Sequence, residues 1–187
     1  MQHQSTLLTD PFLQWPTETS VRVVWFTEFA GQTHTVNYGD GQTAIAHTRQ
    51  LSRTREDRES WLDETIAENT ARFAPKRRPI WRHEAEIVAL TPGERVPYSV
   101  TSINDAGEAI SSREFSLSPL PLAGQPLKIL LTSDHQLMPM TAANLQKVVD
   151  TIGSVDAIFH AGDCVNVPDR ASEWFDDRRG CSFFPCL

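Results

Sequence analysis

Long hydrophobic runs, basic charge and cysteine are all scarce in this sequence of 187 residues. No apolar stretch reaches the roughly 18 residues that a membrane-spanning helix needs, and residues 1–16 lack the pattern of a secretory signal. With 17 Lys and Arg against 24 Asp and Glu, the net charge is −7, which argues against a general nucleic-acid binder or a binder of anionic membranes. We therefore expect neither nucleic acid nor a membrane as a partner.

Cysteine and histidine are rare as well. The three cysteines, Cys164, Cys181 and Cys186, are an odd number without the spacing of a disulfide framework. Free thiols are typical of a reducing compartment, so a cytoplasmic location is favoured. The last of the six histidines is His160, so the C-terminal stretch offers no imidazole to bind a metal ion or to transfer a proton.

The region 10–118, which follows a tail at 1–9, has the pattern of an all-β domain. Apolar residues make up 40% of the chain, enough to form a core. Short alternating segments are separated by turns rich in Gly and Pro, which is typical of a β-sandwich. The expected strands are Val21–Trp25, Thr33–Tyr38, Ala44–His47, Glu84–Leu90, Val96–Asn104 and Glu114–Leu117.

One turn and strand in this region resemble a known domain family. The turn 90–93 (LTPG), the following strand with Tyr98, and the turn 104–107 are similar to a part of fibronectin type III domains. In that family a corner tyrosine stands at the position of Val96, whereas Tyr98 comes two residues later. The resemblance implies a two-sheet sandwich and leaves the corner hydrogen bond in question.

Residues 48–82 form a locally basic segment within an acidic protein. They contain nine Lys and Arg against six Asp and Glu, a net charge of +3. A basic patch can attract phosphate or nucleic acid, but the acids are interleaved with the bases. The pattern therefore favours a solvated loop of mixed charge, and Trp61, Ile66 and Phe73 indicate that it packs against another part of the protein.

A linker at 119–126 is expected to join the sandwich to a second domain at 127–187. In that domain, the apolar runs Leu127–Leu131 and Asp156–Phe159 are typical of strands buried in a parallel sheet. The residues between them follow the spacing of one helix face: Ala142, Leu145, Val148, Val149 and Ile152. Strand, helix and strand over about 30 residues predict a βαβ unit.

Polar residues follow each of these two strands. Asp134 follows the first and Asp163 follows the second, 29 positions later. Because the carboxyl ends of neighbouring parallel strands meet at one edge, the two carboxylates should lie side by side. Two carboxylates at close range repel each other, and a bound cation is the usual compensation. Gly162 allows the backbone to turn just before Asp163.

This pattern resembles the first two motifs of the calcineurin-like metallophosphoesterases, and the order of the two domains is similar to that of purple acid phosphatases. The resemblance implies an α/β phosphoesterase domain, two divalent or trivalent ions (Fe, Mn or Zn) and a phosphate ester as substrate. By this resemblance Asp134 is a ligand of one metal and Asp163 bridges both, with Gln136 and Asn166 as further ligands. Gln136 stands where the family has histidine, and Asn166 where purple acid phosphatases have tyrosine, so tyrosinate chemistry is not implied.

The neighbouring residues have simpler expected roles. His135 is expected to be an exposed loop histidine, and His160 to be a packed side chain at a strand end. Cys164 is expected to be a small buried residue rather than a thiolate ligand.

The later, histidine-containing motifs of the family have no counterpart after Asp163. We therefore expect a C-terminally truncated chain, an inactive fragment of a parent enzyme, whose two-stranded sheet leaves faces and edges uncovered. Two alternatives stay open. One is a non-catalytic interaction module with a β-sandwich and a vestigial α/β remnant, and the other is an acid-pocket domain of the receiver type.

Overall fold

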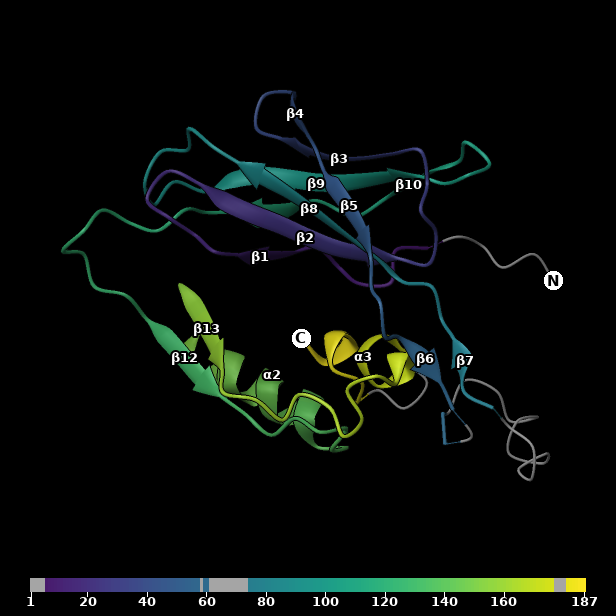
Figure 1. The fold of residues 1–187 in the computed structure, drawn as a ribbon. Coiled ribbons are helices and arrows are strands. Elements are labelled where there is room, and N and C mark those ends of the chain that lie inside the picture. The colour runs from purple at the N-terminus through teal and green to yellow at the C-terminus, as the bar shows by residue number, and fades with distance from the viewer. Residues whose placement is uncertain (1–5, 58, 61–73, 177–180) are drawn as a thin grey trace. The chain divides into compact units, whose positions relative to one another are not determined.

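The computed structural model describes residues 6–57, 59–60, 74–176 and 181–187 (Figure 1). The chain divides into two units. The first, here called the sandwich unit, comprises Met1–Ser52 and Pro79–Gln125, and the second, the α/β unit, comprises Arg53–Arg78 and Pro126–Leu187. The charged segment 53–78 therefore belongs with the C-terminal part of the chain, although it interrupts the sandwich in sequence.

The sandwich unit consists of two antiparallel sheets, drawn as two layers in Figure 1. One sheet has the order β1 (Phe12–Gln14), β2 (Val21–Thr27), β8 (Trp81–Ile87), β5 (His47–Gln50). The other has the order β10 (Ala109–Ser111), β9 (Val96–Ile103), β3 (Thr33–Tyr38), β4 (Gln42–Ile45), and β11 (Phe115–Leu117) also pairs with β9. The expected all-β sandwich is confirmed. The expected strand Ala44–His47 is instead divided between β4 and β5, which belong to different sheets, and β10 was not foreseen.

The core of the sandwich unit forms where alternate residues of both sheets face inward. Val21, Val23 and Trp25 of β2 are fully buried, as are Val36 of β3 and Val100 of β9. The polar end of the tryptophan is satisfied, because its Nε1–H donates to the Ser102 hydroxyl at 2.9 Å. Period-two alternation in the sequence thus produces one continuous apolar layer between the sheets.

Tyr98 does not make a corner hydrogen bond of the fibronectin type, which joins residues close in sequence, because its partner lies 87 positions away. Its ring is buried, and its hydroxyl donates to the backbone carbonyl of Pro11 at 3.3 Å. Burial raises the pKa of this hydroxyl, so it stays protonated and keeps its donor role. The tyrosine therefore connects β9 to the segment preceding β1.

The α/β unit contains the expected βαβ arrangement. β12 (Ile129–Thr132) and β13 (Ala157–His160) pair in parallel, and α2 (Thr141–Ile152) connects them. Gly153 ends the helix with φ of 69°, and its N–H donates to the Val149 carbonyl at 2.8 Å. The remaining elements are β6 (Arg55–Glu56), β7 (Lys76–Arg77), α3 (Ala171–Phe175) and the 3₁₀ turn η2 (Phe184–Cys186). None of the helices in the described ranges is long and apolar enough to cross a membrane.

The apolar side chains of this small sheet are not buried, which corrects the expectation of two buried strands. Leu131 is 71% exposed, Ile158 57% and Phe159 59%. On α2, Leu145 and Val148 are half-buried, whereas Val149 and Ile152 are exposed. The physical reason is that the sheet has two strands, so no further described strand covers its edges or completes its faces.

Candidate metal site

The loops that follow β12 and β13 lie side by side. The last register pair of the sheet is Thr132 with His160, and from there the two loops continue to be hydrogen-bonded to each other. The Asp134 N–H donates to the Gly162 carbonyl at 3.2 Å, and the Gln136 N–H donates to the Asp163 carbonyl at 3.3 Å. The parallel register therefore brings the backbones at positions 134 and 163 to the same end of the sheet.

Three of the four predicted ligand residues have a left-handed backbone. The φ angles are 59° at Asp134, 34° at Gln136 and 53° at Asp163. Such values are uncommon outside glycine, and Asp tolerates them better than most residues. Gly162, with φ of 115°, occupies a conformation that a residue with a Cβ rarely adopts. Backbone strain concentrated in two adjoining loops is typical of a functional site.

Most of the predicted ligand side chains are exposed. Asp134, Asp163 and Asn166 are exposed, and Gln136 is half-buried. The Ser133 hydroxyl donates to the Asp134 carboxylate. The Asn166 side-chain amide donates to the Gln136 carbonyl at 3.2 Å, so the loop after β13 reaches across to the loop after β12.

His135 is buried, which makes the expectation of an exposed loop histidine wrong. It is 6% exposed, and its ring lies 4.5 Å from the His160 ring in an edge-to-face arrangement. The Phe183 ring packs on both, at 5.8 Å from His135 and 5.3 Å from His160. Burial, followed by the nearby His160, holds the pKa of His135 below its usual value, so the neutral ring is favoured. Phe183 thus packs against the histidine next to Asp134, which the sequence did not indicate.

His160 and Cys164 make local contacts rather than forming a metal centre. The Gly162 N–H donates to His160 Nδ1 at 3.3 Å, and the Cys164 sulfur lies 3.4 Å from the same nitrogen. Burial raises the pKa of the Cys164 thiol, so the thiolate that a metal requires is disfavoured. His160 is packed, as expected.

The donors that are present do not complete a two-metal centre. Across the described residues, no group of three or more His, Cys, Asp or Glu side chains could hold a metal ion. The candidate loops supply two carboxylates and two neutral amides, whereas a binuclear site needs several further oxygen or nitrogen ligands. These four residues therefore supply fewer donors than a binuclear centre needs.

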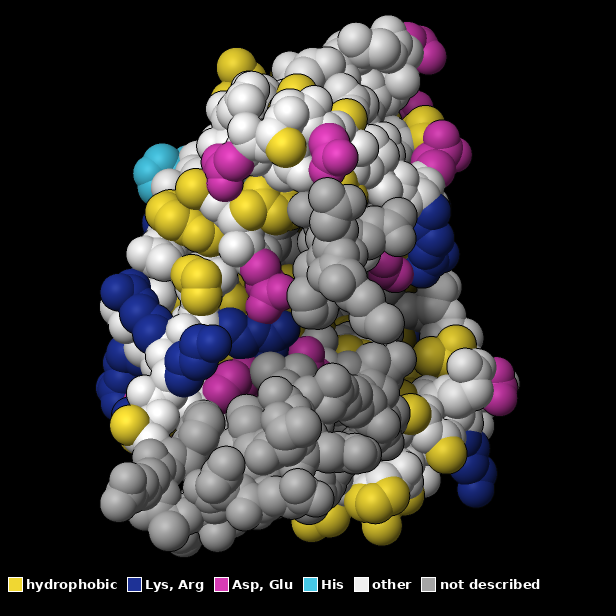
Figure 2. Space-filling view, turned by 90° about the vertical axis from the view of Figure 1, so that its right-hand side faces the viewer, with side chains coloured by type: hydrophobic (Ala, Val, Ile, Leu, Met, Phe, Trp, Pro, Cys, Tyr) yellow, Lys and Arg dark blue, Asp and Glu magenta, His cyan; other side chains and the backbone are white. Residues whose placement is uncertain are grey.

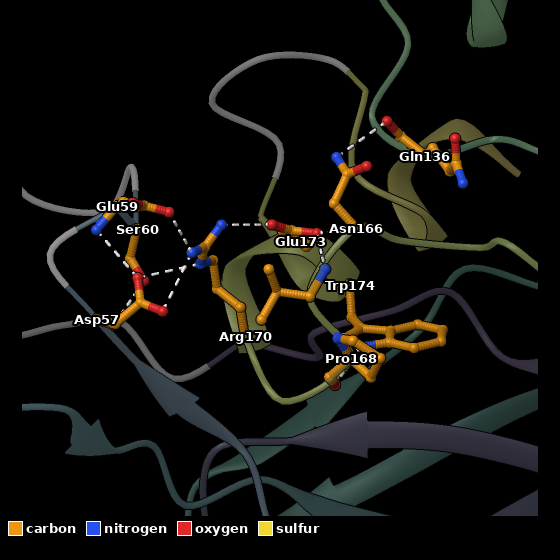
Figure 3. A network of polar contacts seen from close by, with 10 residues as sticks. Asp57, Glu59, Ser60, Gln136, Asn166, Pro168, Arg170, Glu173 and Trp174 are labelled. Carbon is orange, nitrogen blue, oxygen red and sulfur yellow. Dashed lines mark hydrogen bonds and ion pairs between the residues drawn. The ribbon is translucent and has the colours of Figure 1, made fainter.

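A charged network that the sequence analysis missed supports the loop after β13 (Figure 3). Glu173 of α3 accepts the backbone N–H groups of Asn166 and Val167, and Arg170 joins it to Asp57. The signal in the sequence was the Arg170/Glu173 pair at i, i+3 spacing, but its partner Asp57 lies 113 positions away and cannot be found from spacing.

Arg53 and Arg78, at the two ends of the charged segment 53–78, pair with acids of the same unit. Arg53 pairs with Asp169 at 3.0 Å, and Arg78 pairs with Glu56 and Asp176, both at 3.1 Å. On the face drawn in Figure 2, Lys and Arg side chains likewise lie beside Asp and Glu side chains. The charges are mixed, as expected, but a solvated loop over 48–82 is wrong in part. Residues 48–50 lie in β5 and residues 81–82 in β8, and the Arg78 and Glu56 side chains are largely buried. The apolar residues Trp61, Ile66 and Phe73, which were expected to pack, lie outside the described residues.

Comparison with known proteins gives a fold relationship. No protein-family model matches the sequence, and no curated protein matches it. A purple acid phosphatase isolated from yellow lupin (Lupinus luteus) seeds matches 94% of this chain with a TM-score of 0.65 and 19% sequence identity. The match covers 32% of the lupin protein, so this chain spans about a third of its length.

A human fibronectin type III domain is also similar, over 67% of this chain and 90% of its own, with 12% identity. Its TM-score of 0.34 is too low to support an argument. The relationship that remains is that this chain has the fold of the N-terminal part of a purple acid phosphatase, a β-sandwich followed by a short parallel βαβ piece.

Proposed function

We propose that this chain provides the N-terminal part of a metal-dependent phosphoesterase, with a phosphate ester as the substrate of the complete enzyme. The observation that carries the proposal is the pair of hydrogen-bonded loops that place Asp134 and Asp163 at one end of a parallel sheet. Carboxylates in this position are suited to a hard or borderline cation such as Mn, Fe or Zn. Gln136 and Asn166 are the neutral donors beside them.

The remaining ligands would have to come from polypeptide outside these 187 residues. Two carboxylates and two amides cannot hold two cations in a defined geometry, and the edges of β12 and β13 that pair with no described strand leave room for additional strands. In this proposal the chain alone binds a single cation weakly and does not turn over substrate.

The proposal is tested by adding Mn²⁺ to the isotope-labelled full chain and recording amide NMR spectra. Paramagnetic broadening should concentrate on residues 133–136 and 162–166. The double variant Asp134→Asn/Asp163→Asn should lose this localised broadening. The control variant Asp40→Asn/Asp105→Asn, which removes two exposed acids of the sandwich unit, should retain it.

The alternative is a non-catalytic interaction module, for which the acidic loops have no role in metal binding. Broadening that spreads evenly over surface acids, or that survives in the Asp134→Asn/Asp163→Asn variant, would favour this alternative and contradict the proposed function.

A further inference from the structure

A single buried carboxylate accepts two backbone hydrogen bonds from the loop after β13. Glu173 is 2% exposed, and its Oε2 accepts the N–H of Asn166 at 2.8 Å and the N–H of Val167 at 2.9 Å. Two backbone donors on one charged oxygen are strong, directional hydrogen bonds. The position of Asn166 relative to β13 therefore depends on a side chain in the neighbouring helix α3.

The carboxylate is itself held by Arg170. The Arg170 Nη1–H donates to Glu173 Oε1 at 2.6 Å, while Nε and Nη2 donate to the two oxygens of Asp57, each at 3.1 Å. Nη2 also donates to Glu59 at 3.0 Å. The guanidinium thus links three carboxylates, two from the segment before β7 and one from α3, and Figure 3 shows all of these groups turned toward one another. We refer to Asp57, Arg170 and Glu173 as the Arg170 network.

The electrostatics agree with this geometry. Burial alone would raise the pKa of Asp57, but the hydrogen bond from Arg170 and the adjacent positive charges hold it below its usual value. The two carboxylates raise the pKa of Arg170, although burial opposes this. Asp57 and Arg170 are therefore both charged at neutral pH, and the geometry of their ion pair agrees with this.

The backbone of the charged segment is tied to the same place. The Arg55 N–H donates to the Asp169 carbonyl at 2.9 Å, and Arg55 forms a parallel bridge with Arg170. Buried ion pairs add little net stability, because the loss of hydration offsets their attraction. The network is better explained by conformational specificity, because it holds the loop 163–167 in one arrangement.

We propose that Arg170 and Glu173 are positioning residues for the candidate metal site, and that the charged segment, through Asp57, anchors them. The inference rests on the proposed function, because Asn166 and Asp163 are metal ligands only if that function is correct. Asp57 comes from a segment that interrupts the sandwich in sequence, and its role in this proposal lies in the α/β unit.

The first test is amide hydrogen exchange by NMR on the full chain. In Glu173→Gln, exchange at Asn166 and Val167 should accelerate roughly tenfold or more, because a charged acceptor of two hydrogen bonds is lost. Exchange within α2 should not change. Glu94→Gln, the same change in an exposed turn of the sandwich unit, should alter neither. Unchanged exchange at Asn166 and Val167 in a folded Glu173→Gln protein would overturn the proposal.

A second variant guards against loss of folding. If Glu173→Gln loses its dispersed spectrum, Asp57→Asn removes the far end of the network, where the side chain is partly exposed. It should accelerate exchange at the same two amides by a smaller factor. Arg170→Lys keeps the charge but not the planar guanidinium. Its exchange rates at Asn166 and Val167 should therefore lie between those of wild type and Arg170→Met.

The Mn²⁺ titration separates positioning from a merely structural role. In the variants that remain folded, broadening at 162–166 should fall while broadening at 133–136 persists. Faster exchange with unchanged Mn²⁺ broadening would overturn the positioning role and leave the proposed function standing. Absence of localised broadening in the wild-type chain would overturn the proposed function and the positioning role with it, whatever the exchange data show.

Discussion

The rings of His34 and His83 stack in the core of the sandwich unit, with centroids 3.6 Å apart and planes inclined by 19°. His83 is fully buried between the hydroxyls of Thr27 and Thr48, at 2.8 and 2.9 Å. The Ala30 carbonyl can only accept, so His34 carries a proton on Nε2, which donates to it at 2.7 Å. In the neutral ring Nδ1 then accepts from the Ser102 hydroxyl at 2.9 Å, and the same hydroxyl oxygen accepts from Trp25. Both rings fit their surroundings in the neutral form.

This pair predicts that the sandwich loses stability in mild acid. Burial, with the nearby His34, lowers the pKa of His83 to about 3 from 6.5. Between these values the unfolded chain binds a proton that the folded chain does not, so the stabilisation is complete above about pH 6.5 and is lost as the pH falls toward 3. At pH 5 the loss from His83 alone is roughly 2 kcal/mol. Urea unfolding at pH 7.5 and pH 5 measures it.

A variant comparison assigns the pH effect to the stack. His83→Gln should be less stable at pH 7.5 but should show a flatter dependence of unfolding free energy on pH. His47→Gln, at an exposed position of β5, should keep the wild-type slope. Equal slopes in all three proteins would show that other groups cause the acid sensitivity.

The sandwich unit should fold without the charged segment. The Leu51 N–H donates to the Ile80 carbonyl at 2.8 Å, so the two chain ends on either side of 53–78 lie close together. We expect residues 6–125, with 53–78 replaced by a short Gly-Ser linker, to give a β-type circular dichroism spectrum and one cooperative melting transition. A spectrum of an unfolded chain would mean that the segment is required for the sandwich to fold.

Local patterns were sufficient to predict most strands and the βαβ unit. Thr33–Tyr38 was predicted to the residue, because polar and apolar side chains alternate there between two turns. The helix ending at Gly153 was predicted from the spacing of its apolar residues and from the glycine itself, which adopts a left-handed backbone more easily than other residues do. The positions of Asp134 and Asp163 next to each other followed from the parallel register alone.

Contacts between distant residues could not be predicted in this way. Spacing says nothing about which acid meets Arg170, because Asp57 comes from a segment that precedes half of the sandwich. His135 was misjudged because its burial depends on Phe183, a residue of the tail that has no periodic pattern. The exposure of Leu131 depends on how many strands the sheet has, and the number of strands cannot be predicted from the composition of one strand.

The exposed apolar faces of β12 and β13 predict self-association. Leu131 and Phe159 are register partners, and both are mostly exposed. Adjacent apolar groups on a sheet with open edges promote contact between copies. We expect the sedimentation coefficient of the chain to rise with concentration, and Phe159→Lys to reduce this rise. Ile45→Lys, which removes an exposed apolar side chain from β4, should have a smaller effect. Equal effects of the two variants would contradict the assignment to this sheet.

The last prediction is that the 187-residue chain does not hydrolyse phosphate esters at a useful rate. Metal-assisted hydrolysis needs cations that are held rigidly in an open site, and loose placement alone lowers the rate greatly. Asp134 and Asp163 are exposed, none of these 187 residues after Asp163 is a histidine, and the described residues contain no cluster of three ionisable ligands. The test is an assay of the purified chain with an aryl phosphate and Mn²⁺, Zn²⁺ or Fe²⁺, beside the Asp134→Asn/Asp163→Asn variant. We expect the same background rate from both. Metal-dependent turnover that only the wild-type chain shows would mean that the site is completed by some other means, such as a second copy of the chain, and a dependence of specific activity on protein concentration would identify that case.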